Sequence, residues 1–325
     1  MAARALRIAF VTGPFPQFGE TFIVNQIADL IDKKINVNIF AFGQGDASYI
    51  HKRYEAYNMQ ELVTYLDPPT DLFIRFLKAL PLTINLLVCH PNVLLRAINP
   101  WKFGRDAFSL KLLFWVAPFV GKQFDIIHCN YGTTANRYLV IREVLRGQFL
   151  RTPVITTFYG FDVSLKFKEK GSHYYDKLKE VGALFFTMSK EMRQRLITIA
   201  GFNPQKVFSL PVSVDVSGIT SSIPEYKEGK PIEMVSVGRF VEKKGFDDLL
   251  RAVAILKKNT RKPFLLTIVG GGPLEDEMQK LAKDLDILDV VRFAGRMQPE
   301  EILALHRQSH LYVQTSKTAA NGDME

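Results

Sequence analysis

Two basic side chains follow an apolar segment in the last third of the chain. Arg239 and Lys244 lie in the sequence Gly-Arg-Phe-Val-Glu-Lys-Lys-Gly, after the apolar run 232–237 and before a helix expected from Gly245. Arginine provides a planar two-donor fork, lysine a point charge, and a helix start adds backbone N–H groups. Acting together, these groups could bind a diphosphate. The alternative is that the segment is a solvated loop of mixed charge, which would have the same spacing.

A glycine run ends the next apolar segment. Gly270, Gly271 and Gly272 follow residues 264–269, and Pro273 suits the first position of a helix. Glycine at a strand end lets a ligand approach the backbone closely, whereas a tight turn without a ligand would use the same residues. The run is not the dinucleotide fingerprint, because Glu275 stands where its last glycine would be.

The remaining candidates are isolated residues. His128 and Cys129 end an apolar segment, but no second group of ligands follows at zinc spacing, so we expect no metal site. We interpret His128 as a polar residue lining a cleft beside a packed thiol. Ser189, which opens Ser-Lys-Glu-Met, is typical of a helix N-cap and not of a catalytic serine.

Short apolar segments alternate with helical ones along most of the chain. We expect strands at 6–11, 35–42, 125–129, 153–158, 183–188, 206–210, 232–237, 264–269, 290–293 and 311–314. Helices are expected from about Glu20, at 133–147, 189–200 and 299–309, and from Gly245 and Pro273, while 47–121 is helical and irregular. This alternation indicates an α/β fold with parallel sheets.

The Ser/Gly/Pro-rich stretch 216–231 divides this series in two. We therefore predict a Rossmann-like domain at 1–215, a linker at 216–231 and a second Rossmann-like domain at 232–325. Two such domains would face each other across a cleft, with ligands at the carboxyl ends of the strands.

Length and composition agree with two globular domains. The chain has 325 residues, of which 47% are hydrophobic and 23% charged, which excludes bulk disorder and a fibrous protein. Two cysteines cannot form a disulfide framework, so we expect a reducing compartment, the cytoplasm. The first apolar run is too short for the core of a signal peptide.

The positive charge gathers in one apolar stretch. The net charge is +9, and residues 72–124 hold seven basic residues with Asp106 as their only acid. Pro81, Pro91, Pro100 and Pro118 should interrupt this stretch, so we expect no membrane span. Either the stretch lies in the plane of an anionic membrane and is released by salt, or it forms core-facing helices with cationic outer faces. No nucleic-acid module accompanies it, so we expect no nucleic-acid partner.

Six motifs, in order, resemble one enzyme family. GRFVEKKGFDDLL, VGGGPLEDE and VRFAGRMQPEEI resemble the second domain of family 4 glycosyltransferases, whose fold is GT-B, and FPQFGETFIVNQI, IIHCNYGTTA and VITTFYGFDVS resemble the first domain. The closing SHLYVQTSKTAANGDME is most similar to the branch that builds colanic acid and other exopolysaccharides. The resemblance covers nearly the whole chain.

The resemblance implies roles for particular residues. Arg239 and Lys244 match residues that hold the diphosphate of a sugar nucleotide and offset charge on the leaving group, a mechanism that needs no metal and no cofactor. Tyr159 stands where the family has a histidine close to the reacting sugar. Tyrosine can form hydrogen bonds, but its pKa near ~10 makes it a poor proton shuttle. The expected sites are, for catalysis, Arg239, Lys244, Glu325 and Tyr159; for the donor, Gly19, Glu20, Gly238, Gly271, Gly272 and Asp323; and for the acceptor side, Gly160, Asp162 and His128.

The end of the chain departs from the family pattern. Glu325 matches the first of two glutamates separated by seven residues, and the second is not present, so we interpret the second domain as truncated. The other interpretation is that Asp323 and Glu325 form a polar tail.

The sequence thus predicts a cytoplasmic glycosyltransferase, which the membrane contact could place on the inner face of the membrane. It would move a sugar, with retention, from a nucleoside-diphosphate donor to a polysaccharide or lipid-linked acceptor. One alternative is an inactive fragment that binds glycans or membranes. Another is a nicotinamide-dependent oxidoreductase, which the missing dinucleotide fingerprint argues against.

Overall fold

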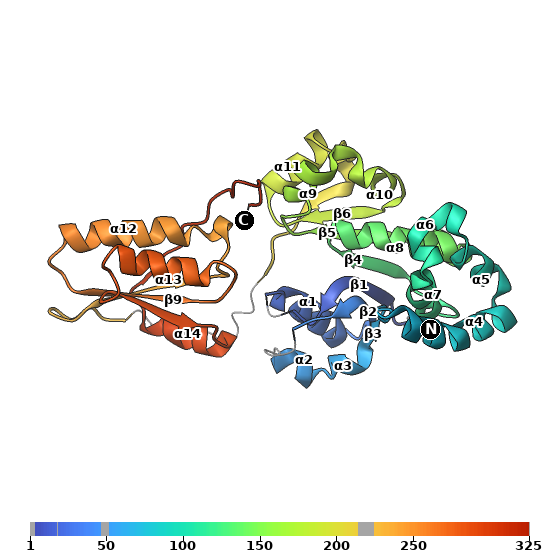
Figure 1. The fold of residues 1–325 in the computed structure, drawn as a ribbon, viewed down its shortest axis with the longest axis horizontal. Helices are drawn as coiled ribbons and strands as arrows, with labels where there is room; N and C mark the ends of the chain where they lie inside the picture. The colour runs from blue at the N-terminus through green and yellow to red at the C-terminus, as the bar shows by residue number, and fades with distance from the viewer. Residues whose placement is uncertain (1–3, 18, 47–51, 214–223, 325) are drawn as a thin grey trace. The chain divides into compact units, whose positions relative to one another are not determined.

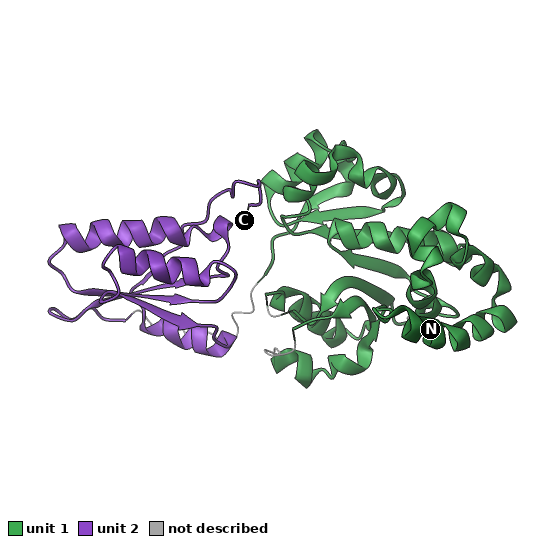
Figure 2. Ribbon diagram, viewed as in Figure 1, with its two compact units in different colours: residues 1–213 green, residues 214–325 purple. Residues whose placement is uncertain are grey.

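Two parallel sheets organise the chain, one in each of two units (Figures 1 and 2). The computed structural model describes residues 4–17, 19–46, 52–213 and 224–324. Unit 1 comprises residues 1–213 and unit 2 residues 214–325. Of the predicted linker, 216–223 lie outside the described residues, and 224–231 contain no helix or strand.

Unit 1 is built on a seven-stranded sheet. Its order is β3-β2-β1-β4-β5-β6-β7, and every pair is parallel. The strands are β1 (Arg7–Phe15), β2 (Asn36–Gln44), β3 (Val63–Tyr65), β4 (Ile126–Asn130), β5 (Val154–Phe158), β6 (Leu184–Thr187) and β7 (Val207–Ser209). The chain leaves β1 towards β2 and β3, then returns on the other side with β4. The connections that leave β1 and β4 therefore run to opposite sides of the sheet. Doubly wound sheets bind ligands at such a point, at the carboxyl ends of the strands.

Helices cover both faces of this sheet. Alternate residues of β1 point to opposite faces, so Ile8 and Phe10 join a core with α1, whereas Ala9 and Val11 join one with α7 and α8. The helices of unit 1 are α1 (Thr21–Asp32), α2 (Lys52–Ala56), α3 (Met59–Leu62), α4 (Leu72–Cys89), α5 (Pro91–Ala97), α6 (Pro100–Phe108), α7 (Lys111–Val116), α8 (Gly132–Leu145), α9 (Leu165–Lys170), α10 (Asp176–Val181) and α11 (Lys190–Thr198).

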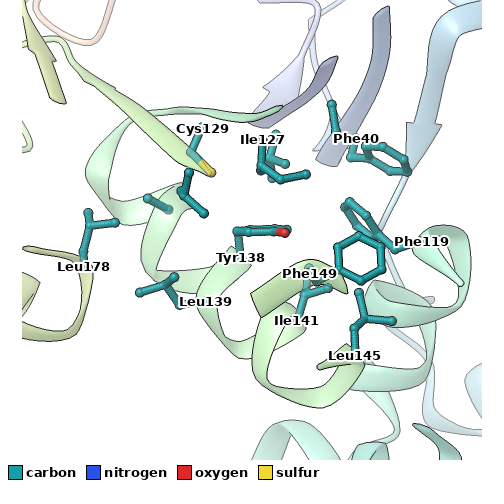
Figure 3. Close-up of a cluster of buried hydrophobic side chains, with 14 of the residues drawn as sticks. Phe40, Phe119, Ile127, Cys129, Tyr138, Leu139, Ile141, Leu145, Phe149 and Leu178 are labelled. Carbon is teal, nitrogen blue, oxygen red and sulfur yellow. The ribbon is translucent and has the colours of Figure 1, made fainter. Parts of the chain in front are cut away.

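The larger core is rich in aromatic side chains (Figure 3). Phe40 from β2 stacks on Phe119 with the ring centroids 3.9 Å apart, and Tyr138 from α8 lies 5.9 Å from Phe119. All three side chains are fully buried. This packing fixes α8 against the sheet, and with it the loop that joins β4 to α8.

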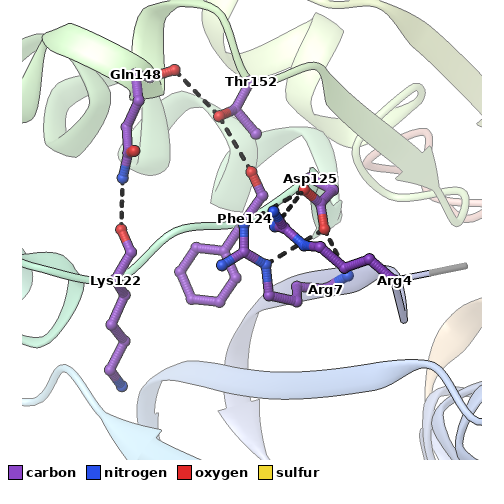
Figure 4. A network of polar contacts seen from close by, with 7 residues as sticks. All are labelled: Arg4, Arg7, Lys122, Phe124, Asp125, Gln148 and Thr152. Atoms are coloured by element: carbon purple, nitrogen blue, oxygen red, sulfur yellow. Dashed lines mark hydrogen bonds and ion pairs between the residues drawn. The ribbon is translucent and has the colours of Figure 1, made fainter. Parts of the chain in front are cut away.

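A carboxylate ties the amino ends of β1 and β4 together (Figure 4). Asp125 accepts hydrogen bonds from the backbone N–H of Arg7 at 2.9 Å and from the side chains of Arg7 and Arg4. Nearby, Thr152 donates to the carbonyls of Gln148 and Phe124. The two central strands are thus set in register at their starts, which aligns their carboxyl ends.

Unit 2 repeats the alternation on a smaller scale. Its four-stranded parallel sheet has the order β10-β9-β8-β11. The elements are β8 (Ile232–Val237), α12 (Phe246–Asn259), β9 (Phe264–Val269), α13 (Glu275–Asp284), β10 (Val291–Gly295), α14 (Pro299–Gln308) and β11 (Leu311–Tyr312). The predicted α/β fold with parallel sheets is confirmed. Ser189 caps α11 as predicted, accepting from the N–H of Met192 at 3.1 Å.

The middle of unit 1 differs from expectation at two places. The edge strand β3 was not predicted, because three residues are too few to show an alternating pattern. Pro81 was expected to interrupt the apolar stretch, and this was wrong: it lies inside α4, which continues through it without the bond to the carbonyl four residues earlier. Pro91 and Pro100 instead occupy the first positions of α5 and α6.

As a result, α4 is a long apolar helix. Among the described residues it is the one helix long and apolar enough to cross a membrane by length and composition alone, with a mean hydropathy of 1.8 and 17% of its residues buried. It is attached to unit 1 by Arg75, whose buried guanidinium donates to the carbonyls of Pro69 at 2.7 Å, Ser109 at 3.2 Å and Thr70 at 3.3 Å.

A close backbone contact holds the carboxyl ends of β8 and β9 together. Gly270 has φ +141°, and a Cβ placed on it would lie 1.9 Å from the carbonyl oxygen of Gly238. The N–H of Gly238 donates to the carbonyl of Val269, and that of Gly270 to the carbonyl of Gly295. A side chain at position 270 would have to separate the strands on which this edge is built.

We therefore predict that Gly270→Ala lowers the free energy of unfolding of unit 2 by at least about 2 kcal/mol, through overpacking and backbone strain. Thermal and urea denaturation followed by circular dichroism would measure it. Gly13→Ala is the control, since a Cβ there has open space. Equal unfolding midpoints for the Gly270 variant and the wild type would contradict the prediction.

Candidate functional site

The carboxyl ends of β1 and β4 bring Glu20 and Tyr131 together. Glu20 begins α1 and Tyr131 follows β4, 111 residues later in the chain. The Tyr131 hydroxyl donates to Oε1 of Glu20 at 2.7 Å. Burial raises the pKa of Glu20, and burial together with the Glu20 charge raises the pKa of Tyr131. The phenol therefore keeps its proton and acts as a hydrogen-bond donor.

The backbone of Tyr131 is strained. Its φ of +71° and ψ of 138° fall in a region that residues other than glycine rarely adopt, at an order-of-magnitude cost of about 1–3 kcal/mol. Its N–H donates to the carbonyl of Thr157 at 2.8 Å. Strain of this kind persists where the surrounding structure enforces it, and it gathers at functional sites.

Asp162 holds the backbone next to Tyr131 in place through hydrogen bonds. Its fully buried carboxylate accepts the N–H of Gly132 at 3.0 Å and those of Tyr159 and Gly160, each at 3.1 Å. One side chain thus ties the loop after β5 to the start of α8. Burial raises the pKa of Asp162 to about 6, while the three N–H donors lower it.

Tyr159 lies against Tyr131 in an aromatic group. Its ring centroid is 4.8 Å from that of Tyr131 and 4.7 Å from that of Phe22, and Phe161 packs on Tyr131 at 5.3 Å. Its hydroxyl donates to Oδ1 of Asn130 at 2.9 Å. Burial raises the pKa of Tyr159 above its usual value, so Tyr159 donates hydrogen bonds and does not serve as a base near neutral pH.

Asn130 leaves a donor unused at this site. Its side chain is buried, and within the described ranges its Nδ2 has no hydrogen-bond partner. A buried amide without a partner is costly, and at 0% exposure the Asn130 side chain lies beneath the surface of this edge. Neither Asn130 nor Tyr131 was predicted as a site residue, and their only signal was their place in the motif IIHCNYGTTA.

His128 lies deeper in the sheet. It is buried, its Nε2 is 2.8 Å from Oγ1 of Thr157, and its ring packs on Phe10 with centroids 4.8 Å apart. Burial lowers the pKa of His128 to about 4, so it is neutral at pH 7. Cys129 beside it is buried, as the packed thiol was expected to be. A contact between His128 and an acceptor stays a prediction.

In unit 2 the two predicted cations follow β8. Arg239 is exposed, and Lys244 ends a short 3-10 helix (Glu242–Lys244) before α12. The aliphatic part of Lys244 lies over Gly238, with its Cδ 3.3 Å from where a Cβ of that glycine would be. Glycine at 238 therefore leaves room for the lysine at the end of the strand.

A third cation, which was not predicted from the sequence, lies at the same edge. Arg296 follows β10, and its Nε is 3.0 Å from where a Cβ of Gly271 would be. Gly272 packs in the same way on the backbone of Phe240. The signal for Arg296 was its position directly after a strand, in the motif VRFAGRMQPEEI. The loops after β8 and β10 thus carry three basic residues at the edge formed by the glycine loop, where Oε2 of Glu275 also lies 3.3 Å from the Cβ position of Gly271.

The end of the chain packs on the loop that carries Lys244. Lys243 pairs with Asp323 at 3.2 Å, and Glu242 accepts the N–H of Ala320 at 2.7 Å. Asp323 was predicted to bind the donor, and its carboxylate is engaged by Lys243. Glu325, predicted to be catalytic, lies outside the described residues. In the described part of the chain, no group of three or more His, Cys, Asp or Glu side chains could hold a metal ion.

Replacing the buried carboxylate gives a test of the unit 1 site. In Asp162→Asn an NH₂ group must face a backbone N–H, so at least one bond is lost and the free energy of unfolding should fall by about 1–3 kcal/mol. The native pKa of about 6 lies above the usual 3.8, so native Asp162 binds its proton more tightly than unfolded Asp162. Wild-type stability should then fall relative to the variant as the pH rises from about 4 to 6.

Urea denaturation of both proteins across this pH range would measure the difference. A difference that stays constant or grows with pH would show that the ionisation of Asp162 is not opposed by the fold.

Comparisons with known proteins agree with this geometry. Residues 220–322 match the family model described as glycosyl transferases group 1. A Salmonella typhimurium protein named as the colanic acid biosynthesis glycosyltransferase WcaL is 30% identical, over 98% of this chain and 78% of its own length. The amylovoran biosynthesis glycosyltransferase AmsK of Erwinia amylovora is 28% identical over the same shares.

A solved structure supports the fold. The structure of Anabaena HepE in complex with UDP and glucose matches with a TM-score of 0.58 and 13% identity, over 96% of this chain and 74% of that one. The oxidoreductase alternative finds no counterpart among these matches. Together with two units of parallel sheet and the relative that is 30% identical, these findings show that the chain belongs to the group 1 glycosyltransferases and has their GT-B fold.

Proposed function

We propose that this glycosyltransferase takes its sugar from a nucleoside-diphosphate donor bound by unit 2. The observation that carries the proposal is the gathering of Arg239, Lys244 and Arg296 at one sheet edge around the Gly270–Gly272 loop. Cations and open backbone together suit two phosphate groups. The Anabaena protein of the same fold, whose structure holds UDP and glucose, supports a nucleotide donor.

In this proposal the cations also assist the reaction. When the glycosidic bond to the diphosphate breaks, negative charge grows on the departing phosphate oxygen, and Arg239 and Lys244 offset it without a metal or other cofactor. The family resemblance also assigns Gly19 and Glu20 of unit 1 to donor binding. Transfer with retention at the anomeric carbon is part of the proposal and follows from the same resemblance.

The acceptor binds at the carboxyl edge of the sheet of unit 1. Tyr131, Tyr159 and Phe22, which are partly exposed, offer ring faces for a sugar. The relatives make colanic acid and amylovoran, by their names, so a growing exopolysaccharide or its lipid-linked precursor is the acceptor we propose. Work on a lipid-linked acceptor would place the enzyme on the inner face of the membrane, attached through residues 72–124.

The donor site is tested by removing its charges. We expect Arg239→Ala and Lys244→Ala each to weaken the binding of UDP or GDP at least about tenfold, because each removes a charge-assisted contact of about 1.5–3 kcal/mol. Isothermal titration calorimetry measures the affinity. Lys258→Ala removes an exposed cation from the far end of α12 and serves as the control. Wild-type affinity in both site variants would overturn the assignment.

The acceptor side is tested at Tyr159. Tyr159→Phe keeps the ring and removes the hydroxyl that donates to Asn130, so we expect about tenfold slower turnover with an unchanged affinity for the nucleotide. Steady-state kinetics with a lipid-linked oligosaccharide acceptor, combined with calorimetry, separates the two quantities. Loss of nucleotide affinity in this variant would instead place Tyr159 in the donor site.

A further inference from the structure

Helix α4 exposes apolar side chains around most of its circumference. A narrow stripe that includes Arg75, Ala79 and Leu86 is buried against unit 1, and the remaining faces are almost entirely Leu, Ile, Val and Phe. A helix that is apolar all round is normally enclosed by protein or by lipid. Within the described residues, nothing encloses α4 on these faces.

The exposure continues into the next two helices. The most exposed large apolar side chains between residues 72 and 108 are Trp101 at 94%, Phe108 at 83%, Val88 at 76%, Phe73 at 70%, Leu72 at 68% and Leu95 at 65%. Helices α4 and α5 contact each other and α7, and α6 also contacts α7, so the three form one group (Figure 1). We call the exposed apolar side chains of residues 72–108 the apolar platform.

The platform is held in a fixed place. Arg75 anchors α4 through three backbone carbonyls, and α7 beneath it buries Leu112, Leu113 and Val116. A helix fastened along one side by a buried arginine cannot leave the unit to cross a bilayer without breaking these bonds. It can present its outer faces to a surface that lies alongside.

The charges on the platform indicate which surface that is. Lys78 and Arg105 are exposed, Lys102 pairs with Glu143 of α8, and Asp106 is the only acid between residues 72 and 108. Two copies of the platform facing each other would bring these cations together. Apolar side chains, a nearly fully exposed tryptophan and flanking lysine and arginine instead match the acyl chains, interface and anionic headgroups of a phospholipid monolayer.

We propose that the apolar platform inserts into one leaflet of an anionic phospholipid membrane, with α4 in the plane of the interface. The proposal rests on the membrane attachment in the proposed function and deepens it: acyl-chain burial holds the protein, and the cations add to it. The attachment should therefore survive high salt, in contrast to the release expected from charge alone.

The wild-type chain carries its own reporter position. Cys89 ends α4 and is exposed, while the other cysteine, Cys129, is buried. An environment-sensitive thiol fluorophore on Cys89 should shift to the blue with vesicles of phosphatidylglycerol and phosphatidylcholine, and keep that shift in about 1 M NaCl, where the Debye length is ~3 Å. No shift, or its loss in salt, would overturn insertion.

A matched pair of variants tests the residues. Phe73→Glu with Trp101→Glu should reduce co-flotation with the same vesicles at least tenfold. Ile255→Glu with Leu288→Glu places the same charges on exposed apolar positions of unit 2, at 62% and 54% exposure, and should float like the wild type. Equal flotation of all three proteins would overturn the proposal.

Two further measurements distinguish lipid insertion from self-association and from misfolding of the variant. Sedimentation without lipid should show a wild-type monomer, and a dimer that the platform variant abolishes would overturn the proposal by assigning the face to a second copy. The midpoint of urea denaturation, which reports on unit 1 as well as unit 2, should be equal in wild type and platform variant, which confirms that the variant is folded. If neither protein binds nucleotide while vesicle binding follows the expected pattern, the donor assignment fails and the insertion stands.

Discussion

A buried carboxylate with three backbone donors holds the carboxyl edge of unit 1 together. Asp162 joins the loop after β5 to the loop after β4, and the contact between the rings of Tyr131 and Tyr159 lies next to that junction. It sets Gly132 at the start of α8, which fixes the strained Tyr131 one residue earlier. It also sets Tyr159 beside Tyr131. Because the carboxylate is fully enclosed, its contribution is geometric: it aligns the loops that follow two strands, β4 and β5, without meeting solvent itself.

Unit 2 reaches a comparable alignment by different means. Here glycines let strand ends approach so closely that no side chain fits between them, and the cations gather around the backbone left open. The junction in unit 2 is made of backbone contacts, and the basic residues lie around it. The junction in unit 1 is made of a buried side chain, and aromatic rings pack around it. The two units thus use similar sheets to prepare two kinds of surface.

The sequence predicted the alternation of strands and helices and the motif that contains Gly160 and Asp162, because these depend on local patterns. It did not predict the partnership of Tyr131 with Glu20, which arises only when β1 and β4 lie side by side. Arg296 was passed over, although it directly follows a strand in the motif VRFAGRMQPEEI, because its nearness to the glycine loop depends on the pairing of β9 with β10. For residues 72–124 the sequence left open whether the apolar side chains contact a membrane or face the core, and only the packing of α4 shows that most of them are exposed. The features that the sequence did not predict are those that depend on contacts between residues far apart in the chain.

The backbone of Tyr131 has a consequence for how this protein can be changed. Glycine would adopt that conformation without strain, so a search for thermally stable variants would favour losing the phenol at this position. The gain in stability would remove the hydroxyl that meets Glu20 and a ring of the aromatic group. Stability and the acceptor contact proposed for Tyr131 thus conflict at a single residue, and melting temperature alone would be a misleading guide to engineering this fold.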